Sequence, residues 1–191
     1  MADRVIFMPI GVNGSKITDW LEGGRVHSKL LRAMSVIQNR EIKFDFVLWH
    51  QGSSDIGTKP TKYKSDFGKL YKIIKEKTSR ATPWIIAMHS RCSGSYDKKI
   101  ETAQQEIANG LPMFYQGPNN NSLGDNYRFD RCHLNKDGQI KMAQLWFDSI
   151  QSANAKKAEF DNESLLRIFR KISFWPSQSK SKPFQNARTK S

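Results

Sequence analysis

An aspartate and a histidine three residues apart form the most reactive pair in this sequence. Asp130 and His133 lie in an irregular segment, residues 127–138, directly before a stretch of helical periodicity. At this spacing the carboxylate can accept a hydrogen bond from one imidazole nitrogen while the other nitrogen faces a substrate. The same pair also occurs as a purely structural hydrogen bond. Its position at the last strand–helix junction favours the catalytic interpretation, with His133 as general base and Asp130 as its orienter.

Two earlier loops carry candidate hydrogen-bond donors. Gln51 follows an apolar run and precedes Gly52, and a side-chain amide at a strand end suits a donor to a substrate oxygen. Around Asn13 and Gly14 a glycine-containing loop can leave backbone N–H groups free to hold an anion, or can serve only as a tight turn. This loop matches neither nucleotide-binding glycine pattern. We expect His50, which lies beside Gln51, to be a structural hydrogen-bonding residue.

The two cysteines leave two interpretations open. Cys92 and Cys132 are the only cysteines, and neither has the paired-thiolate spacing of a zinc site, so we expect no metal. They can be two small buried side chains. Alternatively, they can form one disulfide between the third loop and the last, which would brace the candidate site.

Short apolar runs alternate with segments of helical period, which predicts parallel strands connected by helices. The expected strands are residues 5–8, 44–49, 84–88 and 113–115, and the expected helices are residues 27–40, 63–78, 97–109 and 135–153. Such alternation indicates an α/β fold, a three-layer α/β/α sandwich with a mainly parallel sheet. Ligands bind such sheets beyond the carboxyl ends of the strands. The loops there, residues 9–20, 50–60, 89–97 and 116–133, contain the candidate pair, the candidate donors and both cysteines.

Charge is unevenly distributed along the 191 residues. The formal net charge is +13, and nearly half of the excess lies in residues 156–191. We expect one domain over residues 1–155, a basic amphipathic helix over 156–175 and a disordered basic tail over 176–191. The charge attracts anions without identifying a specific nucleic acid as partner. No apolar run is long enough for a membrane span, and no signal peptide begins the chain.

Three blocks, taken in order, resemble the SGNH hydrolase superfamily, and specifically carbohydrate esterases of the sialate O-acetylesterase type. Residues 9–20 resemble the P-x-x-x-G-G-[ST]-x-I-x-x-W segment of those esterases, and residues 49–55 resemble W-x-Q-G-E-S-D. Residues 130–138 resemble D-x-x-H-[LF] followed by an Asn-x-x-Gly helix start. The resemblance covers most of residues 3–152.

The resemblance implies hydrolysis of an acyl ester, such as an O-acetyl group on a carbohydrate, without metal or organic cofactor. It implies His133 as general base and acid, Asp130 as its orienter, and Gln51 with the Asn13–Gly14 backbone as oxyanion donors. The residues expected to line the substrate pocket are Trp49, Gly52, Ser53, Asp55 and Arg91.

The sequence departs from the family pattern at two places. The family nucleophile is a serine in a loop after a first strand, ahead of the first block. Only residues 1–8 precede that block here, so we expect the first strand and the nucleophile loop to be missing. Ser53 also stands where the family has Glu.

Three classes of function remain open. The first is an esterase that is inactive as given, whose serine comes from a missing N-terminal segment or a partner chain, with Ser15 or Ser54 as relocated alternatives. The second is a catalytically dead glycan-binding protein. The third is a basic protein that binds nucleic acid or an anionic surface through residues 156–191.

Overall fold

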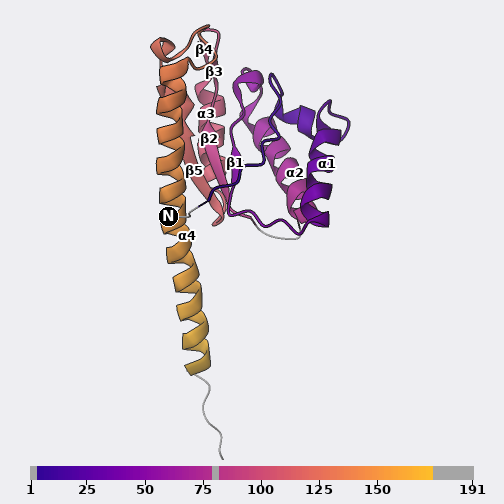
Figure 1. Cartoon of the computed structure of the whole chain (residues 1–191), viewed down its shortest axis with the longest axis vertical. Coiled ribbons are helices and arrows are strands. Elements are labelled where there is room, and N and C mark those ends of the chain that lie inside the picture. The colour runs from indigo at the N-terminus through magenta and orange to yellow at the C-terminus, as the bar shows by residue number, and fades with distance from the viewer. Residues whose placement is uncertain (1–3, 79–81, 174–191) are drawn as a thin grey trace, which may run out of the picture. The chain divides into compact units, whose positions relative to one another are not determined.

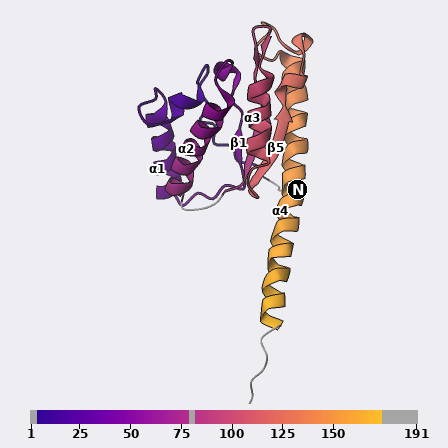
Figure 2. The ribbon, with the colours of Figure 1, turned by 180° about the vertical axis from the view of Figure 1, so that it is seen from behind.

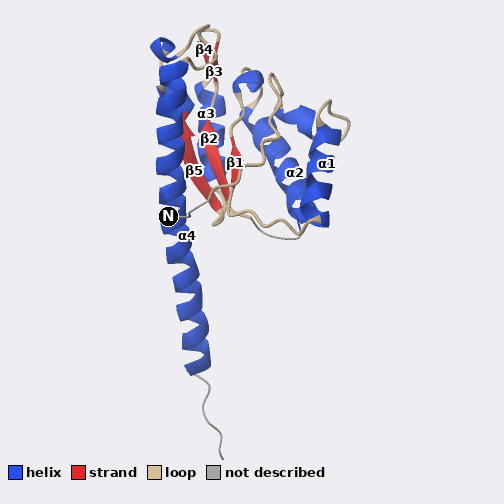
Figure 3. Ribbon diagram, in the orientation of Figure 1, coloured by secondary structure: helices blue, strands red, loops and turns tan. Residues whose placement is uncertain are grey.

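The centre of the protein is a three-stranded parallel sheet. The structure is a computed structural model that describes residues 4–78 and 82–173, with side chains through residue 160. The strands are β1 (Val47–Trp49), β2 (Trp84–Met88) and β5 (Phe114–Asn119), in the order β1-β2-β5 (Figures 1 and 3). Val47 pairs with Trp84, and Trp84 pairs with Phe114. Two-residue strands β3 (Arg91–Cys92) and β4 (Ser95–Tyr96) form a separate antiparallel hairpin.

In the described residues, four α-helices precede, connect and follow these strands. They are α1 (His27–Asn39), α2 (Pro60–Thr78), α3 (Lys98–Ala108) and α4 (Lys136–Ser173). Short 3₁₀ turns are η1 (Ile17–Trp20), η2 (Ser53–Asp55), η3 (Asn120–Ser122) and η4 (Asp125–Tyr127). Asp97 caps α3 by accepting from the backbone N–H groups of Lys99 and Ile100. Asn135 caps α4 by accepting from the N–H of Gly138 at 2.9 Å.

Helices α2 and α3 cover one face of the sheet, and α1 packs against α2. Trp84 of β2 lies at the centre of this layer and is 1% exposed. Its ring packs against Phe67 of α2 at 5.4 Å, Tyr71 of α2 at 5.8 Å and Trp49 of β1 at 6.3 Å. Aromatic rings bury large apolar areas and pack edge to face, as most of these pairs do, so this cluster fixes α2 against the sheet.

Helix α4 covers the opposite face with its first turns. Ile85 and Tyr115 point away from the aromatic cluster and form a second core with Ala153. Trp146 and Ile150 of α4 pack against this second core. Both views of the ribbon show this part of α4 beside β5 (Figures 1 and 2). Helices therefore cover both faces of a parallel sheet, which confirms the predicted α/β/α sandwich.

Three predicted strands were wrong in extent or existence. The strand expected over residues 44–49 begins only at Val47. Residues 5–8 form no strand, and Val5, Ile6 and Phe7 are 69–73% exposed. A strand requires a hydrogen-bonded neighbour, and among the described residues β1 pairs only with β2, so this apolar run stays unpaired. In contrast, β5 continues past residue 115 to Asn119, because Gly117 and Pro118 lie on the edge strand β5, where proline is tolerated.

The two helical segments expected near the C-terminus are one continuous helix. Helix α4 runs from Lys136 to Ser173 without interruption, across both the predicted 135–153 helix and most of the separate 156–175 helix. The chain divides into two compact units, Met1–Asn154 and Ala155–Ser191, so the boundary falls within α4. The predicted disordered tail, residues 176–191, lies outside the described residues.

The contact between β2 and β5 generates a stability prediction. A Cβ on Gly117 would lie 2.8 Å from the backbone carbonyl of Ile86, whereas a Cβ on Gly68, inside α2, would meet nothing within 4 Å. We expect Gly117→Ala to lower the free energy of unfolding by about 1–3 kcal/mol, through overpacking. The matched Gly68→Ala should raise it by about 1 kcal/mol, since alanine is the better helix former. Urea unfolding measures the change in free energy for both variants. A stabilising effect of Gly117→Ala would contradict the close contact between Gly117 and Ile86.

Candidate active site

Asp130 and His133 form a closely hydrogen-bonded pair in a tight turn after β5. The Asp130 Oδ2 atom accepts from His133 Nδ1 at 2.6 Å, and Oδ1 accepts from the backbone N–H groups of Cys132 at 2.9 Å and His133 at 2.6 Å. The turn closes through a hydrogen bond from the Phe129 N–H to the His133 carbonyl. Because Nδ1 carries the proton toward Asp130, Nε2 is the atom that can accept a proton from another group.

The electrostatics of the pair favour an ionised carboxylate. The hydrogen bond from the His133 ring, with the two backbone N–H donors, lowers the pKa of Asp130 to about 2. The His133 side chain remains 55% exposed and the Asp130 side chain 41% exposed. The Phe129 ring stacks on the His133 imidazole, with centroids 5.7 Å apart. The pair is thus fixed in geometry and open to a ligand.

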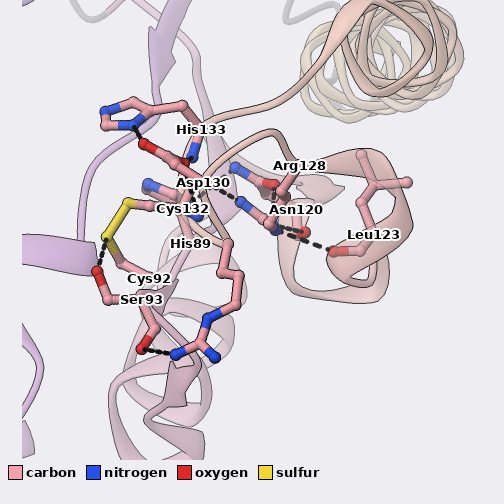
Figure 4. Close-up of a disulfide and its surroundings, with 10 residues drawn as sticks. His89, Cys92, Ser93, Asn120, Leu123, Arg128, Asp130, Cys132 and His133 are labelled. Atoms are coloured by element: carbon pink, nitrogen blue, oxygen red, sulfur yellow. Dashed lines mark hydrogen bonds and ion pairs between the residues drawn. A yellow bond between two sulfur atoms is a disulfide. The ribbon is translucent and has the colours of Figure 1, made fainter.

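A disulfide ties this turn to the hairpin that follows β2. Cys92 and Cys132 are bonded through their sulfur atoms, across a sequence separation of 40 residues (Figure 4). The sequence left open whether the two cysteines are separate or bonded, and the structure contains the disulfide. Because Cys132 directly precedes His133, the bond restrains the backbone that carries the imidazole.

A buried arginine supports the same turn from within. Arg128 is 6% exposed and donates only to neutral oxygens: the carbonyl of Leu123 at 3.2 Å, the carbonyl and side-chain oxygen of Asn120 at 2.9 and 2.8 Å, and the carbonyl of Cys132. Sequence analysis did not single out Arg128, because a basic residue in a loop looks the same whether it is solvated or buried.

Two histidines and an asparagine meet at the carboxyl ends of the three strands. His50 follows β1, His89 follows β2, and Asn120 follows β5. The Asn120 Nδ2 atom lies 3.0 Å from His50 Nε2 and 2.8 Å from His89 Nδ1, and the two imidazole rings are 4.7 Å apart. His50 thus forms a hydrogen bond with Asn120, as a structural residue is expected to do. The sequence did not identify His89 or Asn120 as site residues. The sequence feature that could have identified the histidines is that each directly follows an apolar run.

Both imidazoles in this cluster are neutral at ordinary pH. Loss of hydration around the ring, followed by the charge of Arg128, lowers the pKa of His50 to about 4. Loss of hydration, followed by the charges of His50, Arg128 and His133, lowers the pKa of His89 to about 3.

Gln51 does not present its amide to a ligand as expected. Its Nε2 donates to the Ser15 carbonyl at 3.0 Å and to Asp55 Oδ2 at 2.6 Å, which uses both N–H groups. Asp55, expected in the substrate pocket, is 2% exposed and also accepts from the Ile17 N–H at 2.9 Å. These two residues hold the first two loops together, because a buried carboxylate needs several donors.

The other expected pocket residues lie in different environments. Trp49 is partly buried and packs against the rings of Trp20, Phe67 and Trp84. Gly52 has a φ of +149°, and a Cβ there would lie 2.2 Å from the His89 carbonyl, so this close approach requires glycine. Ser53 begins η2 and is partly buried. Arg91 donates to Asp125 at 3.1 Å.

The expected oxyanion backbone lies in an exposed turn. Gly14 has a φ of +65°, a turn conformation that favours glycine, and the Asn13 carbonyl accepts from Arg25 at 3.3 Å. Within residues 4–78 and 82–173, no hydrogen bond joins Asn13, Gly14 or Gln51 to His133. The same residues contain no cluster of three His, Cys, Asp or Glu that could hold a metal, and no helix apolar enough to cross a membrane.

The depressed pKa of Asp130 gives a direct test of the pair. A carboxylate with a folded-state pKa near 2, below its usual 3.8, stabilises the fold above pH 3.8 and loses that contribution as the pH falls through 2. Carboxyl-carbon NMR should therefore show Asp130 titrating near pH 2. In His133→Ala the midpoint should rise toward 3.8, because the ring donor is lost, and should stop short of it because the backbone donors remain. An unchanged midpoint in the variant would refute the interaction.

Removing the buried guanidinium tests the support for the turn. We expect Arg128→Met to lower the free energy of unfolding by about 3 kcal/mol, because charged hydrogen bonds contribute roughly 1.5–3 kcal/mol each and their acceptors would stay buried. The control is Arg131→Met, at an exposed arginine in the same turn with one long contact to the Ser93 carbonyl. It should change stability by less than about 0.5 kcal/mol. Equal effects in urea unfolding would contradict the role of Arg128.

Comparison with known proteins identifies the family. A family model described as "Carbohydrate esterase, sialic acid-specific acetylesterase" matches residues 2–152. No curated protein and no solved structure matches the chain. The matched residues contain the sheet, the Asp130–His133 pair, the disulfide and the histidine–asparagine cluster. The chain therefore belongs to the family of sialic acid-specific carbohydrate acetylesterases.

Proposed function

We propose that this protein acts on O-acetyl groups of carbohydrates, with His133 as the general base and acid and Asp130 as its orienter. The observation that carries the proposal is the 2.6 Å hydrogen bond from His133 Nδ1 to the Asp130 carboxylate, which leaves Nε2 to take up a proton. Membership of the acetylesterase family supports the substrate class. The exposed position of the His133 ring allows a sugar ester to approach it.

The reaction uses the pair in two proton transfers. His133 Nε2 takes the proton of an attacking hydroxyl or water as that oxygen bonds to the acyl carbon. The ionised Asp130 stabilises the imidazolium that forms, and its low pKa keeps the carboxylate from taking the proton itself. His133 then returns the proton to the sugar oxygen as the carbon–oxygen bond of the ester breaks.

The identity of the attacking serine is a separate part of the proposal. Among them, no serine hydroxyl is hydrogen-bonded to His133. Ser15, one relocated alternative, is 6% exposed, and its hydroxyl donates to the Val12 carbonyl and accepts from the Trp20 indole. We propose that the serine comes from a further segment or a partner chain. The chain as given then hydrolyses esters only slowly, with water as the nucleophile.

A hydrolysis assay with matched histidine variants tests this function. The full chain is incubated with an O-acetylated methyl glycoside, and acetate release is measured for the native protein, His133→Ala and His27→Ala. His27 bonds the Trp20 carbonyl and makes no contact with the pair, so it controls for non-specific imidazole catalysis. We expect slow, saturable release that His133→Ala abolishes and His27→Ala retains, because His133 is the base that activates the attacking water.

The same samples are treated with a fluorophosphonate, which labels activated serines, and mapped by mass spectrometry. We expect no adduct. An adduct that disappears in His133→Ala would support the esterase function. It would refute the proposal that the serine comes from a further segment or a partner chain. Saturable glycoside binding without acetate release would instead identify a glycan-binding protein. Retention on a polyanion that falls steeply with salt, with no glycoside binding, would favour the anion-binding alternative and overturn the esterase function.

A further inference from the structure

The side-chain amide of Asn120 has all of its hydrogen-bonding groups assigned. A guanidinium has only donors, so the 2.8 Å contact from Arg128 requires the oxygen of the amide, Oδ1, to face Arg128. The NH₂ group must then face the two histidines, and it has two hydrogens for two ring nitrogens. One is His50 Nε2 at 3.0 Å and the other is His89 Nδ1 at 2.8 Å. Arg128 therefore fixes the orientation of the amide.

The amide orientation determines the tautomer of each imidazole. Because Nδ2 of Asn120 is a donor, His50 Nε2 and His89 Nδ1 must both be acceptors without a proton. The proton of neutral His50 is therefore on Nδ1, and that of neutral His89 is on Nε2. Among the residues that the structure describes, neither of these N–H groups has an acceptor.

These two donors lie where a substrate is expected to bind. His50 and His89 directly follow β1 and β2, at the carboxyl edge of the sheet. His50 keeps exposed surface although its ring packs against His89 and Trp146. Arg128 links the cluster to the catalytic turn, since the guanidinium that holds Asn120 also donates to the carbonyl of Cys132, next to His133 (Figure 4).

We propose that His50 Nδ1–H and His89 Nε2–H donate hydrogen bonds to the carbonyl oxygen of the bound acyl group, the task expected of Gln51. Arg128 and Asn120 are positioning residues that set these protons before the ligand arrives. Neutral imidazoles suit this task, because a donor fixed in place stabilises the charge that develops on the carbonyl oxygen without giving up its proton. The proposal rests on the proposed function for the identity of the ligand.

Nitrogen NMR of the imidazoles at pH 7 tests the positioning. In the native chain, we expect His50 as the Nδ1–H tautomer, the rarer form in solution, and His89 as the Nε2–H tautomer. Asn120→Asp replaces the donating NH₂ by an acceptor oxygen of similar size, so both tautomers should reverse. A native His50 protonated on Nε2 would overturn the proposal. If Asn120→Asp fails to fold, as judged by circular dichroism, the tautomers of the native chain still show whether the proposal is correct.

Titration with acetate, the product of deacetylation, tests the ligand. The His50 Nδ1–H and His89 Nε2–H resonances should shift saturably, and Asn120→Asp should weaken binding by roughly tenfold or more, as the loss of a charged hydrogen bond predicts. Absence of a shift in both resonances up to high acetate concentration would overturn the proposal. Acetate bound at these protons with no glycoside hydrolysis would contradict the proposed function alone. Hydrolysis with neither resonance responding would contradict this inference alone.

Discussion

The buried guanidinium of Arg128 is the interaction on which the site depends. Burial of a cation costs free energy unless every donor is satisfied, and here the partners are three backbone carbonyls and one amide oxygen. These partners belong to η3, the residue after it and the turn that carries Asp130 and His133. One residue therefore fixes both the backbone next to His133 and the amide that faces His50 and His89.

A second buried network holds the earlier loops to the sheet without contacting the Asp130–His133 pair. Gln51 donates to Asp55 and to the Ser15 carbonyl, and its own carbonyl accepts from Gln104 of α3 at 2.8 Å. Gln104 also accepts from the His89 N–H at 2.8 Å. A fully satisfied polar network in a low-dielectric interior makes the loop positions rigid. Gln51 thus connects loops in this structure, and both of its amide N–H groups are used within the protein.

The disulfide and the arginine restrain the same backbone by different means. The Cys92–Cys132 bond acts mainly on the unfolded chain by closing a loop, whereas the Arg128 hydrogen bonds act only in the folded state. Together they compensate for the exposure of the Asp130–His133 turn, in which both side chains are partly open to solvent. Open access for a ligand and a fixed imidazole geometry are thereby compatible.

Local pattern in the sequence determined the parts of the fold that depend on local forces. Helices α1 to α3, strand β2 and the caps Asp97 and Asn135 follow from apolar period and from side chains that reach their own backbone. The Asp130–His133 pair is equally local, since three residues separate its members. The sequence also predicted the layered architecture, because strands that alternate with helices are compatible with few chain topologies.

Only the tertiary structure decided which distant groups meet. Residues 5–8 have the composition of a strand, but pairing depends on a neighbouring strand, and here no described strand accepts them. Trp49, Gln51 and Asp55 have residue types that suit a ligand site, and long-range burial places them in the core or in a buried network. The cluster of His50, His89 and Asn120 spans up to 70 residues of sequence. Its geometry arises only when parallel strands bring their carboxyl ends to one edge and Arg128 turns the amide between the two rings.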